Sequence, residues 1–420
     1  MTKKTPLFEC HHQLSANMST FAGYYMPLWY KSGARNEHLA VISNCGLFDT
    51  SHMSVIIIQG GTARELLQKL TAKDLNACLG KEKNPLEPFR AVYSVYLNEQ
   101  GHSIDDTIIF QVSKDLFISV VNASMGEIIS KHLNNYREDN VEIIDLTDRL
   151  GKIDLQGPTS VKTLMKILKN PDKITSLKYF SFTGYFDNKY RGDIEEILTI
   201  KNFPIMVSRT GYTGEIGFEL FVDIKFAGDL WKLLLEAGLE FGILPCGLAS
   251  RDSLRVGAML PLSHQDIGNW PFINNPWSFA LPYSDNKKGF TKDFIGAKAL
   301  LENKSTDFTL PFLGFDVRKV PSGGEAVVND CEKNLTGRVL TCVTDSAIDR
   351  SENNVYSIIS PDKPANLTIK GLSCGFIKVD KNMEKGTKVT LEYKGRTIDV
   401  EIVDHIRPNL TARVSIKQFI

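Results

Sequence analysis

Two adjacent aspartates, Asp105 and Asp106, stand in the segment GHSIDDTIIF, which has the composition of a β-strand. Side chains alternate along a strand, so Asp106 is expected on the more apolar face, with Ile104, Ile108 and Phe110. A carboxylate on such a face needs a cation or a hydrogen-bond donor, or it takes up a proton. Asp106 is therefore a candidate for orienting an amine or for proton transfer. The strand pattern alone leaves open that both aspartates are surface groups.

A second acidic candidate, Glu219, follows three regularly spaced glycines in RTGYTGEIGFEL, residues 209–220. The glycines are not spaced as GxGxxG, and a strand-like segment follows them instead of a helix. These two features argue against a dinucleotide-binding or phosphate-binding loop. Glycines at this spacing indicate a tight connection in which two backbone segments approach closely. On the strand pattern alone, Glu219 is expected to be a half-exposed carboxylate.

Two arginines lie one helical turn apart in GLASRDSLRVGAML. Helical spacing places Leu248, Arg251, Arg255 and Met259 along one stripe. Paired guanidinium groups suit a carboxylate or phosphate ligand, because each presents planar, paired donors. They equally suit a structural ion pair with Asp252 or with a more distant acid, and the sequence does not decide between these two interpretations.

The histidine and cysteine patterns predict neither a metal site nor a disulfide framework. The eight histidines form no HxH or HExxH arrangement, and the seven scattered cysteines form no CxxC pair. His52, in FDTSHM, is therefore assigned to packing or to a hydrogen bond. Cys246, in LPCGLASRD, is expected to be a small buried hydrophobe and not a nucleophile.

The order of strand-like and helical segments predicts an α+β protein. A strand at 54–58, a helix at 62–70, three strand-like segments and a helix from 126 belong to a first lobe of roughly residues 51–139. A second block of strands and helices completes residues 1–304. Residues 305–420 contain short alternating segments between turns, which is typical of a β-barrel or sandwich. The domain boundary is expected near residue 304.

Composition narrows the class of protein. A length of 420 residues predicts two or three domains, and 42% hydrophobic with 23% charged residues is ordinary for a soluble folded chain. Forty-nine basic residues balance forty-nine acidic ones, so neither nucleic acid nor an anionic membrane is an expected partner. The N-terminus shows no apolar signal segment and no long apolar stretch follows, so a cytoplasmic location is expected.

Several segments, taken in order, resemble the aminomethyltransferase (T-protein) family of the glycine cleavage system. The resemblance extends collinearly over roughly residues 5–300 and rests on TPLFECHHQLSANMSTFAGYYMPLWY, NCGLFDTSHM, AVYSVYLNEQGHSIDDTIIF, VVNAS, LQGP, SRTGYTGEIGFEL, CGLASRDSLR and KDFIGAKAL. It implies a three-lobed fold around a central hole that binds tetrahydrofolate. The implied activity transfers a one-carbon unit from an aminomethyl group, carried on the lipoyl arm of H-protein, to tetrahydrofolate with release of ammonia.

The resemblance also assigns residues to the site. Asp106 would be the catalytic carboxylate that positions the folate amine and assists proton transfer. Glu219 would accept hydrogen bonds from the pterin. The remaining residues implied to line the folate or substrate pocket are Arg251, Tyr93, Asn122, Met53 and Tyr212. No metal is implied.

Two segments, 257–283 and 341–354, depart from the family pattern. Gly257 and Ser278 stand where the family commonly has acids, and TCVTDSAIDRSENN replaces a C-terminal family signature. These changes are expected to affect the rim that faces the one-carbon donor more than the pterin site. They keep two alternatives open: a tetrahydrofolate-dependent demethylase of a small methylated compound, and a non-catalytic folate-binding relative.

Overall fold

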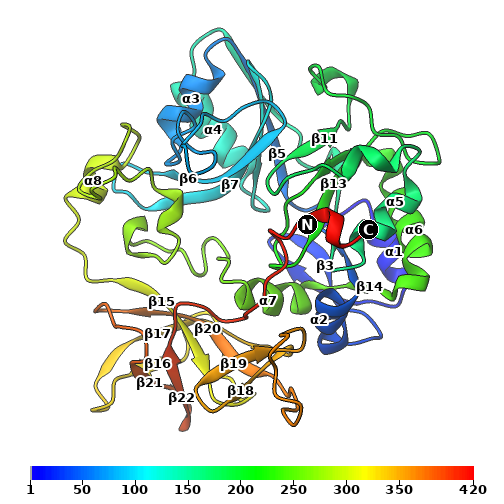
Figure 1. Ribbon diagram of the computed structural model, residues 1–420. Helices are drawn as coiled ribbons and strands as arrows, with labels where there is room; N and C mark the ends of the chain where they lie inside the picture. Colours follow the sequence, from blue (N-terminus) through cyan, green and yellow to red (C-terminus); the bar gives the residue numbers. More distant parts are fainter. Residues whose placement is uncertain (1) are drawn as a thin grey trace.

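A five-stranded antiparallel sheet forms the first lobe of the structure, a computed structural model that describes residues 2–420 (Figure 1). The strands lie in the order β6-β7-β8-β5-β9. Two helices cover one face of this sheet and form a hydrophobic core with it. These elements are β5 (Ser54–Gly60), α3 (Ala63–Leu70), β6 (Arg90–Leu97), β7 (Ser103–Ser113), β8 (Leu116–Val121), α4 (Gly126–Tyr136) and β9 (Val141–Asp145). The strands and helices predicted for this lobe are therefore confirmed, whereas its limits as a domain stay a prediction.

A six-stranded sheet in the order β11-β12-β13-β10-β4-β14 forms the second lobe. A small sheet, β1-β3-β2, belongs to the N-terminal segment. Apolar faces of α5 and α6 pack on the large sheet and contribute to one hydrophobic core. The elements are β1 (Lys3–Lys4), α1 (Phe8–Gln13), β2 (Asn17–Phe21), β3 (Tyr24–Trp29), α2 (Ala34–Ser43), β4 (Cys45–Asp49), β10 (Leu150–Gln156), α5 (Ser160–Ile167), β11 (Phe182–Gly184), β12 (Met206–Ser208), β13 (Gly217–Asp223), α6 (Ala227–Gly238) and β14 (Ile243–Cys246).

The glycine-rich connection between β12 and β13 has two of the properties that its sequence indicates. Gly214 has φ +78°, a left-handed conformation that disfavours other residues. A side chain at Gly211 would place its Cβ 2.2 Å from Gln156 Oε1, so the backbone approaches the neighbouring strand closely. The connection joins the two strands of a hairpin, since β12 and β13 pair antiparallel.

The third lobe is a closed six-stranded barrel in the order β15-β20-β17-β16-β21-β22, which confirms the barrel predicted for the C-terminal region. Each strand matches one of the short alternating segments of the sequence. They are β15 (Phe308–Gly314), β16 (Val327–Asn329), β17 (Leu335–Asp345), β20 (Leu372–Val379), β21 (Lys388–Tyr393) and β22 (Arg396–Ile402); the hairpin of β18 (Ile348–Ser351) and β19 (Asn354–Ser357) is attached to it, and α8 (Ala297–Leu301) precedes it.

Helix α7 (Leu248–Gly257) lies where the lobes meet (Figure 1). Near its C-terminus, the buried Arg407 donates hydrogen bonds to Asp345 Oδ2 at 2.7 Å and to the carbonyl of Thr213. His38 contacts the other oxygen of Asp345 at 2.9 Å. One buried cluster therefore joins the barrel, the glycine-rich hairpin and α2, which fixes the barrel relative to the second lobe.

None of the helices in the described part of the chain combines the length and the apolar character needed to cross a membrane.

Candidate active site where the three lobes meet

One large cavity, of about 1670 Å³, is lined by all three lobes and by α7. The seven site residues taken from the sequence lie far apart along the chain, yet all of them contribute to its wall. They are Met53, Tyr93, Asp106, Asn122, Tyr212, Glu219 and Arg251. The fold therefore brings the whole predicted set together in one space.

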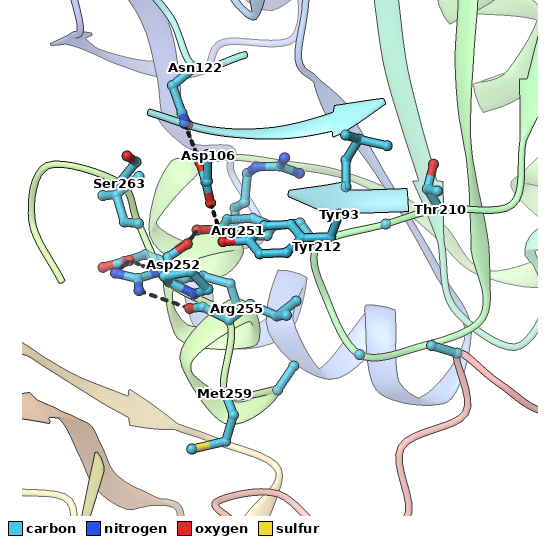
Figure 2. Close-up of a pocket in the computed structure, with 18 of the residues that line it drawn as sticks. Tyr93, Asp106, Asn122, Thr210, Tyr212, Arg251, Asp252, Arg255, Met259 and Ser263 are labelled. Atoms are coloured by element: carbon cyan, nitrogen blue, oxygen red, sulfur yellow. Dashed lines mark hydrogen bonds and ion pairs between the residues drawn. The ribbon is translucent and has the colours of Figure 1, made fainter. Parts of the chain in front are cut away.

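Asp106 projects from β7 into this cavity and accepts two hydrogen bonds (Figure 2). Tyr93, on the neighbouring strand β6, donates its hydroxyl to Oδ2 at 2.9 Å. Asn122, just after β8, donates its side-chain amide to Oδ1 at 2.6 Å. Both donors are neutral groups, so the carboxylate is held in place without a direct cation.

Asp105, which the sequence did not single out as a site residue, is fully buried behind Asp106. It accepts the backbone N–H of Asn122 at 2.9 Å and the side-chain amide of Asn122 at 2.8 Å. Asp106 shares its face of the strand with Ile104 and Ile108, as expected, but this face is partly exposed to the cavity, whereas Asp105 lies on the more buried face. The adjacent aspartates were the only signal of this arrangement in the sequence.

The environment of Asp106 favours the protonated form. Burial and the nearby negative charge of Asp105 raise the pKa of Asp106 to about 7, against the smaller opposing effect of its two hydrogen-bond donors. A carboxyl group with this pKa can gain and lose a proton near neutral pH, which is the property required of a general acid or base.

Glu219 lies on β13, directly opposite Asp154 of β10. Its side chain is buried, with a residue exposure of only 9%, so the expected half-exposed carboxylate is wrong. The reason is that Lys152, on the same face of β10, forms ion pairs with both Glu219 and Asp154, while Thr210 donates its hydroxyl to Glu219. This counter-charge allows an acid to remain inside the sheet.

Arg251 completes this group of charges from α7. Its guanidinium donates to Asp154 Oδ2 at 2.7 Å and lies 4.8 Å from the ring centre of Tyr212. Burial alone would raise the pKa of Asp154, but the positive charges of Lys152 and Arg251 lower it to about 2. Lys152 and Asp154 were missed in the sequence, although charged residues alternating in the strand segment GKIDLQ were a usable signal.

Arg255 has a structural position at the edge of the cavity. It forms an ion pair with Asp252 (Figure 2). It also pairs with Asp266 and donates to the carbonyl of Leu260 at 3.1 Å. The structural ion pair considered for Asp252 is therefore present. The prediction that Met259 lies on the same helical stripe as Arg251 and Arg255 is wrong. Helix α7 ends at Gly257, and Met259 adopts φ +60° in the following turn.

The other predicted residues shape the cavity wall. Tyr212 donates its hydroxyl to the carbonyl of Pro261, which fixes the phenol ring beside Arg251. Met53 follows β4 and is partly exposed to the cavity. His52 is buried against Phe21, with ring centres 5.8 Å apart, and burial lowers its pKa to about 4. The packing assigned to His52 is confirmed, and its ring also forms part of the wall.

The described residues offer no metal site, and Cys246 is not suited to act as a nucleophile. Within residues 2–420, no group of three or more His, Cys, Asp or Glu side chains could hold a metal ion. Cys246 is buried in β14, and burial raises the pKa of its thiol well above the usual value. It is therefore a core residue, as expected.

Both atypical segments contribute to the cavity wall. Gly257 and Ser278 are not themselves among the lining residues, but their neighbours Ala258, Trp277 and Phe279 are, so the expected effect on the rim stays a prediction. A side chain at Gly257 would place its Cβ 2.0 Å from Asp345 Oδ2, which means that the Asp345–Arg407 ion pair takes up this space. The segment 341–354 lines the cavity through Cys342, Val343, Thr344 and Ser346.

Comparison with known proteins decides the family. The model of the GCVT N-terminal domain matches residues 7–270. An aminomethyltransferase of Halothermothrix orenii is 30% identical over 406 residues, which cover 96% of this chain and 98% of that protein. The chain belongs to the aminomethyltransferase (T-protein) family of the glycine cleavage system.

Other members of the family support the same assignment. The aminomethyltransferase of Geobacillus thermodenitrificans is 38% identical over 267 residues, covering 64% of this chain and 67% of that protein. The crystal structure of glycine cleavage system aminomethyltransferase T from Bartonella henselae superposes with a TM-score of 0.74 at 27% identity and covers 96% of this chain and 97% of that one. As in this T-protein relative, the three-lobed fold extends over nearly the whole chain, including the C-terminal barrel.

Proposed function

We propose that this T-protein family member transfers a one-carbon unit from a lipoyl-bound aminomethyl group to tetrahydrofolate and releases ammonia. The observation that carries the proposal is the shared cavity: Asp106 and Glu219, from two different sheets, line the same space. One acid is suited to proton transfer and the other is held by fixed counter-charges. Both lie within the residues that match the family model.

The residues around Glu219 fit a pterin. A carboxylate offers about four acceptor positions, and Lys152 and Thr210 take one on each oxygen, so further N–H groups can still be accepted. Tyr212, Tyr93 and Met53 supply flat or apolar parts of the wall of the same cavity. Two buried polar atoms of the wall, His52 Nδ1 and Ser263 Oγ, have no hydrogen-bond partner within residues 2–420, which suits a polar heterocycle.

Asp106 is assigned the proton transfers. Formation of methylene-tetrahydrofolate removes two N–H protons from the acceptor, while the departing sulfur and the departing amine each take up one. With a pKa of about 7, Asp106 can accept a proton and return it. Asn122 and Tyr93 hold the carboxylate in one orientation, so the contribution of this chain is positioning and proton transfer.

The size of the cavity supports a second participant. Pockets for a single small molecule are typically about 300–1,000 Å³. The cavity here is about 1670 Å³, which leaves room for tetrahydrofolate and for the end of a lipoyl arm. A lipoylated H-protein is accordingly the proposed carrier of the aminomethyl group.

The test is a reconstituted reaction with tetrahydrofolate and lipoylated H-protein that carries an aminomethyl group. We expect ammonia and 5,10-methylene-tetrahydrofolate in equal amounts, measured by enzymatic ammonia assay and by chromatography. In parallel reactions, small methylated amines and sulfonium compounds replace H-protein. Formation of methyl-tetrahydrofolate in those reactions alone would overturn the proposal in favour of a demethylase.

The alternatives gain no support from the relatives, which are named aminomethyltransferases. The departures at the rim were the reason to consider a demethylase, and Gly257 and Ser278 themselves do not line the cavity, although their neighbours do. A purely folate-binding role would not need a carboxyl group with a pKa near neutrality in the wall.

A further inference from the structure

His264 has a backbone conformation that is uncommon for histidine. It lies in the turn between α7 and the residues that lead to the barrel, and its φ is +67°. Residues other than glycine adopt this conformation at an energetic cost, and such positions concentrate at functional sites. The turn is held by Asp266, which accepts the backbone N–H of Leu262 at 2.9 Å and pairs with Arg255.

The strained turn places the His264 ring beside the aspartate pair. Its Nε2 lies 3.4 Å from Asp105 Oδ1, and the same oxygen accepts the amide of Asn122, which also binds Asp106. The ring is half-exposed, whereas Asp105 is fully buried. Among residues 2–420, His264 is thus the nearest cation, when protonated, to a buried carboxylate whose other hydrogen-bond donors are neutral.

His264 also lies between two cavities. Its side chain lines the large cavity and a second, smaller cavity of about 350 Å³ between the first lobe and the barrel. Through this second cavity the ring can exchange protons with solvent without passing the proposed folate site.

We propose that His264 is a positioning residue of the transfer reaction: held on its left-handed turn against Asp105, it places a positive charge beside the aspartate pair and thereby tunes the protonation of Asp106. The inference rests on the function proposed above. His264 acts through Asp105 and does not itself touch the reacting atoms.

The charges around the ring agree with this role. The hydrogen bond to Asp105 raises the pKa of His264, against the opposing effect of burial. Conversely, the charge of His264 lowers the pKa of Asp106, although burial and Asp105 together still raise it to about 7. The other titratable or charged groups that face this region are Tyr93, Tyr212, Asp252, Arg255, Asp266, Asp307, Arg338 and Lys378.

The decisive variants are His264→Asn and His264→Gly. Both remove the titrating ring, and both replacements tolerate a left-handed backbone, so each is expected to fold with a melting temperature at or above that of the wild type. In each variant we expect the midpoint of the acid limb of kcat/KM, near pH 7 in the wild type, to move upward by about 0.5–1 pH unit. A profile that overlays the wild-type profile would overturn the inference.

A matched control separates backbone strain from charge. Lys333 also has φ +67°, but lies exposed in a turn of the barrel. Lys333→Gly relieves the same kind of strain and should leave the pH profile unchanged. If Lys333→Gly shifted the midpoint as far as His264→Gly does, backbone relaxation would explain the result and the inference would fail.

A second measurement does not depend on turnover. In an NMR titration of the free protein, the His264 resonance is identified by its loss in His264→Asn. Its pKa should lie above the ordinary value of 6.5 and should fall in Asp105→Asn. An ordinary pKa that Asp105→Asn does not change would overturn the inference whatever the reaction is. Absence of folate turnover in the wild type would instead contradict the proposed function and leave this measurement valid.

Discussion

Asp106 and Glu219 line one cavity, but their surroundings differ in the sign of the nearest charge. Glu219 and its neighbour Asp154 share Lys152, and Arg251 adds a second cation. Asp106 has a second carboxylate, Asp105, behind it. The cations lower the pKa of Asp154 to about 2, whereas burial and the like charge raise the pKa of Asp106 to about 7.

This difference separates two tasks that acids perform in one site. A carboxylate balanced by buried cations is fixed in charge and position, which suits recognition of N–H groups on a bound heterocycle. A carboxylate beside a like charge changes protonation near neutral pH, which suits proton transfer. The following predictions test this division, beginning with the largest expected effect.

Asp106→Asn should lower kcat by about 10²–10⁴-fold while the dissociation constant for tetrahydrofolate changes by less than about threefold. The amide keeps the shape of the side chain but cannot take up the proton. Stopped-flow or steady-state assays give kcat, and calorimetry gives the dissociation constant. Asp139→Asn, an exposed carboxylate in the same lobe, is the control and should behave as wild type. Wild-type turnover in Asp106→Asn would remove this residue from the mechanism.

Lys152→Met should destabilise the protein by about 3–5 kcal/mol, because it leaves two acids buried without their shared cation. The Lys152 side chain is only 3% exposed. The measurement is the free energy of unfolding in denaturant, compared with Lys166→Met. Lys166 pairs with Glu240 on the surface, so its loss should cost less than about 1 kcal/mol. Equal effects of the two substitutions would show that the buried cluster does not need Lys152.

The pH dependence of stability should distinguish the two acids. The native protein holds the Asp106 proton up to about pH 7, whereas the unfolded chain releases it near 3.8, so this residue makes the protein less stable as pH rises through that window. Asp154 affects stability in the opposite direction. Its stabilising contribution is present above pH 3.8 and is lost as the pH falls toward 2.

Between pH 4 and pH 8, the titration of Asp106 should lower the free energy of unfolding of the wild type by roughly 1–3 kcal/mol. Asp106→Asn should lack this loss of stability. Unfolding free energies at the two pH values test this. Parallel stability curves for the variant and the wild type would mean that Asp106 titrates normally in the native protein.

The order of strands and helices could be predicted from sequence because each element has its own local pattern. The alternating segments of the barrel and the apolar face of α6 specify their structure without reference to distant residues. The end of α7 was misjudged because Met259 continues the helical spacing, although the chain turns at Gly257. There, Arg255 pairs with Asp266, which lies beyond the helix, and the local periodicity carries no sign of this contact.

The site itself could be predicted only in part. The segments around Asp106 and Glu219 identified both acids, but the burial of Glu219 depends on Lys152, which is 67 residues away along the chain. His264 was missed for the same reason, since its contact with Asp105 forms only when the turn after α7 meets the first lobe. Ion pairs between residues far apart in the chain produce no periodic pattern in the segments around Glu219 and His264.

Glu219→Ala should weaken tetrahydrofolate binding by about tenfold or more, because one charged acceptor is lost. Calorimetry of the folded variant measures the effect, and circular dichroism verifies folding, since Lys152 still pairs with Asp154. Glu240→Ala, an exposed acid on the same lobe, should bind as wild type. Unchanged affinity in Glu219→Ala would assign Glu219 to the structural cluster alone.

Tyr93→Phe should have the smallest effect, a reduction of kcat/KM at pH 7 of about three- to tenfold. The hydroxyl bond from Tyr93 lowers the pKa of Asp106, so its removal should move the pH midpoint upward while the ring still lines the cavity. Tyr96→Phe is the matched control: it lies on the same strand and loses a comparable bond, to Ser119 at 2.9 Å, but on the buried side of the sheet. A shift of equal size in both variants would mean that strand β6 acts through packing and not through the hydroxyl. A shift in Tyr93→Phe alone would show that neutral donors, and not only the neighbouring acid, set the protonation of Asp106.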